Sequence, residues 1–305
     1  INQIRLFPHN FDNQEVLQHQ LLITSNPIVE ISKDFYGNSV GNFNILQPHK
    51  EMIIESQMVV RVNHSLKIPD IETAKISDLE METKKNSSLL RLCSPEKSAQ
   101  QKKIDAFLKK INYKDKPITE IAQKCSEYIF KNFTYTKGIT NVETTIDEIL
   151  VHKKGVCQDF AHVLLQFLRT AGIPSRYVSG YICPNTAGYR GEGATHAWVE
   201  FYTPTQGWLG IDPTNNIWTM ENHVKLSVGR DFNDCTPVKG TFKGIAKQTL
   251  SVSVSIGYED GRQFEEVNDV KLQKVSEEVQ RQLDLIEYQL KLQLRQQQQQ
   301  QQQQQ

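Results

Sequence analysis

Residues 155–161, Gly155-Val156-Cys157-Gln158-Asp159-Phe160-Ala161, decide how this chain is interpreted. The cysteine follows a glycine and opens a stretch whose apolar residues recur at helical spacing as far as Leu168. A cysteine at that point lies in the positive field of a helix N-terminus, which favours the thiolate, the nucleophilic form of the side chain. The stretch therefore predicts an activated Cys157 at the start of a buried helix.

Two further residues complete the inventory of a cysteine acyl-transfer site. His196 lies on a predicted strand of alternating residues, and Asp212 follows the next predicted strand, just before Pro213. His162 is nearer in sequence, but it lies five residues along the helix and points about 140° away from Cys157. We therefore assign Cys157 as nucleophile, His196 as base and Asp212 as the carboxylate that orients the imidazole.

The remaining chain divides by composition and pattern. Residues 1–68 contain short apolar runs separated by turn signals, which predict a β-sandwich-like N-terminal domain. Residues 69–103 are polar, and we expect a linker with at most one short helix. Residues 104–262 show helices first and then an antiparallel run of strands, which predicts an α+β core. Residues 263–305 predict a helical tail that ends in ten glutamines and that is either a tether or a self-association helix.

Bulk properties narrow the function. The formal net charge is zero, so nothing favours nucleic acid or an anionic membrane as a partner, and no apolar run approaches the roughly 20 residues of a spanning helix. The five cysteines are scattered and include no Cys-x-x-Cys pair, which argues against a disulfide framework or a structural zinc site. Free thiols suit a reducing compartment, so we expect a cytoplasmic protein.

Several stretches resemble the bacterial transglutaminase-like superfamily, whose members are often described as cysteine proteases. The core pieces are 154–162 (KGVCQDFAH), 172–181 (GIPSRYVSGY), 195–200 (THAWVE) and 208–214 (WLGIDPT). The N-terminal pieces are 5–8 (RLFP), 34–38 (DFYGN) and 47–49 (QPH). The resemblance implies a papain-like core, with the nucleophile helix packed on an antiparallel sheet, and it places the family's triad on Cys157, His196 and Asp212.

We therefore expect a cysteine hydrolase, a peptidase or amidase, that acts on peptides or proteins through a thioester and needs no cofactor or metal. Two alternatives stay open: a transglutaminase-type acyltransferase, and a non-catalytic binding module on the same fold. The backbone N–H of Cys157 is a candidate oxyanion donor, and Tyr135 or Gln158 is a candidate for the second. Trp198 either packs beside the site or walls the acyl pocket. The loop from Cys183 to Gly193 is either a substrate-facing edge or an ordinary connection.

Overall fold

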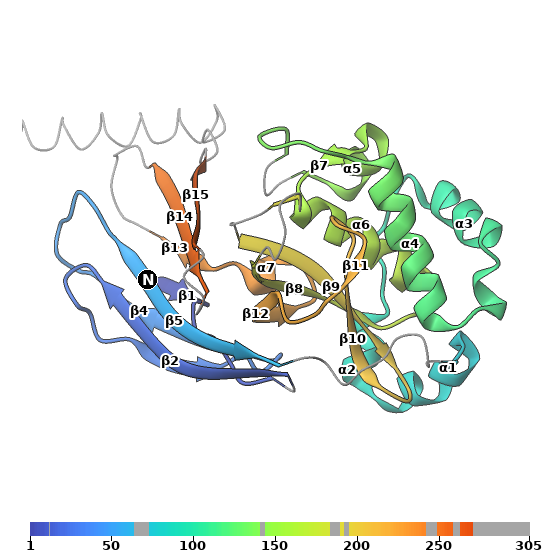
Figure 1. The fold of residues 1–305 in the computed structure, drawn as a ribbon, viewed down its shortest axis with the longest axis horizontal. Helices are drawn as coiled ribbons and strands as arrows, with labels where there is room; N and C mark the ends of the chain where they lie inside the picture. Colours follow the sequence, from blue (N-terminus) through green and yellow to red (C-terminus); the bar gives the residue numbers. More distant parts are fainter. Residues whose placement is uncertain are drawn as a thin grey trace, which may run out of the picture.

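A computed structural model describes residues 1–11, 13–63, 73–140, 144–183, 190–191, 195–241, 249–258 and 263–270. A β-rich part built mainly from the first third of the chain lies beside a mixed helix-and-sheet core (Figure 1). The α+β class that the sequence predicted is confirmed, and the N-terminal sheets are present.

The N-terminal part contains two sheets around a small apolar cluster that includes Ile4, Phe7 and Phe43. Its strands are β1 (Asn2–Ile4), β2 (Gln14–Ile23), β3 (Glu30–Lys33), β4 (Ser39–Phe43) and β5 (Ile54–Val62). β2 and β5 form one ribbon, and the other sheet has the order β13-β1-β4-β3. Since β13 (Val238–Gly240) comes from beyond the core, the chain returns to complete the N-terminal sheet.

The prediction of a mostly irregular linker over residues 69–103 is wrong. The structure has α1 (Ile76–Lys85), α2 (Ser87–Leu92) and the start of α3 (Gln101–Lys110) there. Each helix buries only a few apolar side chains, among them Leu79, Leu89 and Ile104. With so few apolar residues on short helices, the sequence shows little helical periodicity. The helices are stabilised by packing on the core, which the local sequence does not reveal.

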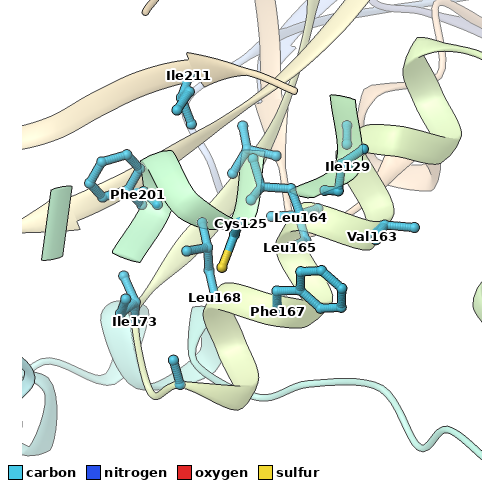
Figure 2. Packing of buried hydrophobic residues seen from close by; sticks show 14 of the residues in the cluster. Cys125, Ile129, Val163, Leu164, Leu165, Phe167, Leu168, Ile173, Phe201 and Ile211 are labelled. Atoms are coloured by element: carbon cyan, nitrogen blue, oxygen red, sulfur yellow. The ribbon is translucent and has the colours of Figure 1, made fainter. Parts of the chain in front are cut away.

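The core helices agree closely with the sequence pattern. They are α4 (Ile118–Asn132), α5 (Ile146–His152) and α6 (Cys157–Thr170), preceded by a 3₁₀ turn (Tyr113–Asp115) and followed late in the chain by α7 (Phe232–Cys235). α6 packs against α4 on one side and the central sheet on the other. Side chains such as Cys125, Leu164 and Phe201 interdigitate between them (Figure 2).

The central sheet is antiparallel and has the order β11-β10-β9-β8-β12. Its strands are β8 (Ser175–Ile182), β9 (Thr195–Thr203), β10 (Gly207–Asp212), β11 (Ile217–Trp218) and β12 (His223–Gly229). β9 and β10 are the two predicted strands that carry His196 and lead to Asp212, whereas β11 and β12 were not predicted. β11 has two residues, and a register shift between Lys225 and Ser227 interrupts the alternation of β12.

Ion pairs of a buried glutamate connect three strands of this sheet. Glu200 on β9 forms ion pairs with Arg176 on β8 and Lys225 on β12. Burial opposes ionisation of the carboxyl group, but Lys225 and Arg176 outweigh it and lower the pKa of Glu200 to about 2. The carboxylate thus ties three strands of the sheet together in its charged form.

The C-terminal region departs from the predicted tail. β14 (Leu250–Gly257) and β15 (Gln263–Val270) pair as a hairpin, although a helix was expected from residue 263 onwards. Residues 271–305, with the rest of the predicted helix, its proposed self-association role and the glutamine run, lie outside the described residues. Within the described part of the chain, no helix is long and apolar enough to cross a membrane.

Candidate active site

Cys157 is the first residue of α6, and hydrogen bonds to the Asp159 carboxylate fix the backbone around it. The Asp159 carboxylate accepts hydrogen bonds from the backbone N–H of Val156 (2.7 Å) and from the Thr140 hydroxyl (2.6 Å). A Cβ on residue 155 would lie 2.4 Å from Asp159 Oδ2, so Gly155 makes this approach possible. The half-buried thiol is thereby fixed at the helix N-terminus, as the sequence predicted.

His196 lies near the start of β9, is 2% exposed, and forms a 2.9 Å hydrogen bond from Nε2 to Asp212 Oδ2. The β9–β10 register, in which Ile211 pairs with Val199, places the end of one strand beside the start of the other. The second ring nitrogen, Nδ1, is buried and makes no hydrogen bond of normal geometry. With Nε2 committed to the carboxylate, Nδ1 is the nitrogen left for proton exchange.

Electrostatics favour the imidazolium. Burial lowers the pKa of His196, but the charge and hydrogen bond of Asp212, together with the interaction with Cys157, outweigh burial and raise it to about 10. Asp212 is fully buried, which disfavours its charge, yet His196 and then His223 hold the pKa of this carboxyl well below its usual range. An imidazolium between a carboxylate and a thiol is the charge arrangement that stabilises a thiolate.

The Asp212 carboxylate is held by two further donors. Oδ1 accepts from the backbone N–H of Thr214 at 2.8 Å, and Oδ2 accepts from Asn215 Nδ2 at 2.8 Å. Because each oxygen has a donor in addition to its strand position, the carboxylate is fixed relative to the imidazole.

The three weaker candidates have different environments. Tyr135 lies on β6 (Thr134–Tyr135), which pairs with β7 (Lys154–Gly155) directly before the nucleophile, so its side chain belongs to the site region. Gln158 is half-buried at the second position of α6. Trp198 is 1% exposed, packs in a cluster with Val178 and Val228, and has its ring 6.4 Å from that of His196, so its role at the acyl pocket stays a prediction.

The histidine left out of the site has a separate structural role. His162 accepts a hydrogen bond from the backbone N–H of Phe232 at Nε2 (3.2 Å), and burial lowers its pKa to about 4. His162 was excluded as the base because it points away from Cys157 on the helix, and in the structure its side chain contacts α7 instead.

Residues that sequence reasoning missed surround Asp212 and His196. His223 begins β12, with Nε2 3.8 Å from Asp212 Oδ2 and its ring 5.1 Å from that of Trp198. The backbone of Arg190 meets Asn215, and Gly191 borders the His196 ring. Each looks like an ordinary polar or turn residue in the sequence, and only long-range pairing reveals its position. Arg190 and Gly191 are, after Cys183, the part of the predicted substrate-facing loop that the structure describes.

One group in the described part of the chain has the composition of a metal site. The ligand atoms of His196, Asp212 and His223 lie within 4.8 Å of one another, and all three residues are buried. His196 Nε2 and Asp212 Oδ2 are already engaged with each other, so a bound ion would have to break their hydrogen bond. The three side chains therefore fit a hydrogen-bonded histidine–carboxylate pair better than a resident metal ion. The absence of a metal requirement stays a prediction.

Comparison with known proteins agrees with this geometry. Residues 105–213 match the model of the transglutaminase-like superfamily, and residues 1–61 match the bacterial transglutaminase-like N-terminal region. An uncharacterized protein of Mycobacterium tuberculosis is 31% identical over 272 residues, which cover 82% of this chain and 84% of the relative. The chain belongs to the transglutaminase-like superfamily.

A solved structure and a further sequence relative are also similar to this chain. A solved structure from Cytophaga hutchinsonii, named a "Putative Cysteine Protease", superposes with a TM-score of 0.65 at 19% identity, covering 90% of this chain and 86% of that one. A Pseudomonas aeruginosa protein-glutamine gamma-glutamyltransferase is 33% identical over 108 residues, or 33% of this chain and 16% of that protein. The first supports the transglutaminase-like fold along most of the chain.

Proposed function

We propose that this transglutaminase-like protein is a cysteine-dependent hydrolase that cleaves amide bonds of peptides or proteins. The observation that carries the proposal is His196, held at Nε2 by Asp212 and raised in pKa to about 10 by Asp212 and Cys157. Burying a charged imidazolium costs free energy, so its position next to a half-buried thiol favours a role in ionising that thiol over a role in packing alone. The same cost argues against a non-catalytic binding module.

The proposed reaction has two halves. His196 holds the Cys157 proton, and the thiolate adds to the amide carbonyl carbon. The C–N bond then breaks as His196 protonates the departing amine, which leaves a thioester. Water attacks the thioester carbonyl while His196 accepts its proton, the C–S bond breaks, and the proton returns to the Cys157 sulfur as the acid is released.

Oxyanion stabilisation is assigned to groups beside the thiol. The backbone N–H of Cys157, at the first position of α6, has no intrahelical acceptor and points out of the helix N-terminus. Tyr135 is our first choice for the second donor, because its hydroxyl and His196 Nδ1 both border Gly191. The Gln158 side chain is the other candidate.

A second function is transamidation, in which a primary amine replaces water in the last step. The name of the Pseudomonas aeruginosa relative, which aligns with 33% of this chain, favours it. The thioester and the residues that form it are common to both routes.

The five cysteines are free thiols, which supports our proposal of a reducing, cytoplasmic setting.

The test uses a glutamine-containing peptide library incubated with and without a labelled primary amine and analysed by mass spectrometry. We expect cleaved or deamidated peptides from the wild type and none from Cys157→Ala or His196→Ala. Cys93→Ala removes another half-buried free thiol and should leave the products unchanged. Products that persist in Cys157→Ala would refute the cysteine mechanism, and amine adducts that outnumber hydrolysis products would establish transamidation instead.

A further inference from the structure

Asn215 joins two parts of the site that are distant in sequence. Its Nδ2 group donates to Asp212 Oδ2 at 2.8 Å and to the carbonyl of Arg190 at 3.3 Å, and its Oδ1 accepts from the Arg190 N–H at 2.7 Å. Both amide hydrogens and one acceptor position of this half-buried side chain are therefore used. A single amide holds the catalytic carboxylate and the backbone of residue 190 together.

The Arg190 end of this connection is anchored on a helix. The Arg190 guanidinium stacks over the Phe130 ring at 4.3 Å, and its Nη1 lies 3.5 Å from the carbonyl oxygen of Phe130, on α4. The side chain of Arg190 and its backbone are thus fixed by different neighbours, which leaves little freedom for the residue that follows.

That next residue, Gly191, borders the reactive side of the imidazole. Its φ of +80° is accessible mainly to glycine, and a Cβ there would lie 3.2 Å from His196 Nδ1 and 3.3 Å from the Tyr135 hydroxyl. Nδ1 is the nitrogen that the proposed reaction uses. The Gly191 backbone therefore limits where the ring can move on that side, while Asp212 holds the opposite nitrogen.

We propose that Asn215 is a positioning residue, which holds the Asp212 carboxylate and the Arg190–Gly191 backbone in one rigid unit around the His196 ring. This inference rests on the proposed function, since it concerns the ion pair of Cys157 and His196. Asn215 contacts neither of those two residues and acts through Asp212 on one side and Gly191 on the other.

The neighbouring asparagine provides a matched control. Asn216 accepts hydrogen bonds from Gln123 and Ser126 on α4, and its φ is +54°. Asn216→Gly keeps that backbone conformation and removes an amide side chain one position away from Asn215. It should change thermal stability at most, with no effect on the ionisation of Cys157.

The experiment measures the rate at which iodoacetamide alkylates Cys157 in the full chain between pH 5 and 10, with peptide mass spectrometry to separate the five cysteines. The ionisable groups around His196 are Cys157 on α6, Asp212 at the end of β10, His223 on β12 and Tyr135 on β6. We expect Asn215→Ala to move the midpoint of the profile about one pH unit towards alkaline, which slows alkylation about threefold at pH 6 and about tenfold at pH values below the wild-type midpoint. Above pH 9 the variant should converge with the wild type, because the thiol is then ionised without help.

A double-mutant cycle separates positioning from a general effect on folding. If Asn215 acts through Asp212, Asn215→Ala should add less than twofold in an Asp212→Asn background. Gly191→Ala, at a half-buried position, tests the other end of the connection and should also slow alkylation at pH 6. Full additivity of the two substitutions, or an Asn215→Ala profile identical to that of the wild type, would overturn the inference. A wild-type Cys157 that ionises like an ordinary thiol would instead refute the proposed function itself.

Discussion

Replacing Asp212 by asparagine should return Cys157 to the behaviour of an ordinary thiol. The carboxylate oxygen lies 2.9 Å from His196 Nε2, and at an effective dielectric constant of about 20 this separation corresponds to about 6 kcal/mol of attraction for the imidazolium. The rise in the His196 pKa from 6.5 to about 10 corresponds to about 5 kcal/mol, at about 1.4 kcal/mol per pKa unit. The two figures are of similar size, so the charge of Asp212 is large enough to offset the burial of the imidazolium and is its largest stabilising contribution.

Without that charge, burial lowers the pKa of His196, and the ring is neutral at pH 6.5. The asparagine amide can also turn an N–H towards Nε2, which would move the imidazole proton to Nδ1, the nitrogen that has to accept the thiol proton. The Cys157 thiolate would then lack the imidazolium that stabilises it. We therefore expect alkylation of Cys157 by iodoacetamide at pH 6.5 to fall by about 100-fold, with recovery above pH 9.

The matched control is Asp231→Asn, because Asp231 caps the N-terminus of α7 by accepting from the Asn233 N–H. Asparagine caps a helix as well as aspartate does, so this variant should leave the alkylation profile unchanged. Alkylation of Asp212→Asn within threefold of the wild type at pH 6.5 would show that the carboxylate does not sustain the ion pair. That result would refute the electrostatic reasoning even if the variant folds normally.

Three further predictions concern stability, measured by urea denaturation. Gly155→Ala should destabilise the protein by about 1–3 kcal/mol, because its Cβ would meet the Asp159 carboxylate at 2.4 Å; a change below about 0.5 kcal/mol would contradict this. Leu164→Ala should cost about 2–5 kcal/mol, since this fully buried side chain lies in the main core, and an exposed control, Leu90→Ala, should cost much less. The charged form of Glu200 stabilises the sheet above the ordinary pKa of about 4.5, and this contribution should disappear as the pH falls from 4.5 through about 2. Glu200→Gln should flatten that part of the pH dependence, and an unchanged slope would argue against it.

The parts of the fold that were predictable have strong local signals. The glycine-led start of α6 and the aromatic and β-branched residues of β8 after the Ile173–Pro174 turn both identify their elements without tertiary information. The same is true of His196 and Asp212, since each occupies a recognisable position on or after a strand. Local pattern was sufficient here because each element buries a complete apolar face.

The elements that were missed depend on distant partners. Residues 263–270 were included in the predicted helical tail, whereas pairing with β14 supplies the hydrogen bonds that make them the strand β15. His223 begins a strand, β12, whose partner, β8, lies some forty residues earlier. No local propensity carries that information, which resides in the register of the assembled sheet.

Buried amide side chains connect these observations. Asn38 exchanges hydrogen bonds with both backbone groups of Val228 (2.7 and 2.9 Å), and Gln14 does the same with Lys225 (2.8 and 2.7 Å). Both partners lie on β12, the edge of the central sheet, so two side chains of the N-terminal part satisfy an edge that would otherwise lack a neighbouring strand.

Asn215 repeats this arrangement at Arg190, where it pairs with one residue's N–H and carbonyl while also holding Asp212. An amide is the one neutral side chain with a donor and an acceptor spaced to replace a strand partner at a single residue. The same chemistry that attaches the N-terminal part to the central sheet thus also fixes the backbone beside the catalytic imidazole. It follows that substitutions at Asn38 and at Asn215 should differ in kind: the first should weaken the contact between the two parts of the molecule, and the second should alter the ionisation of Cys157.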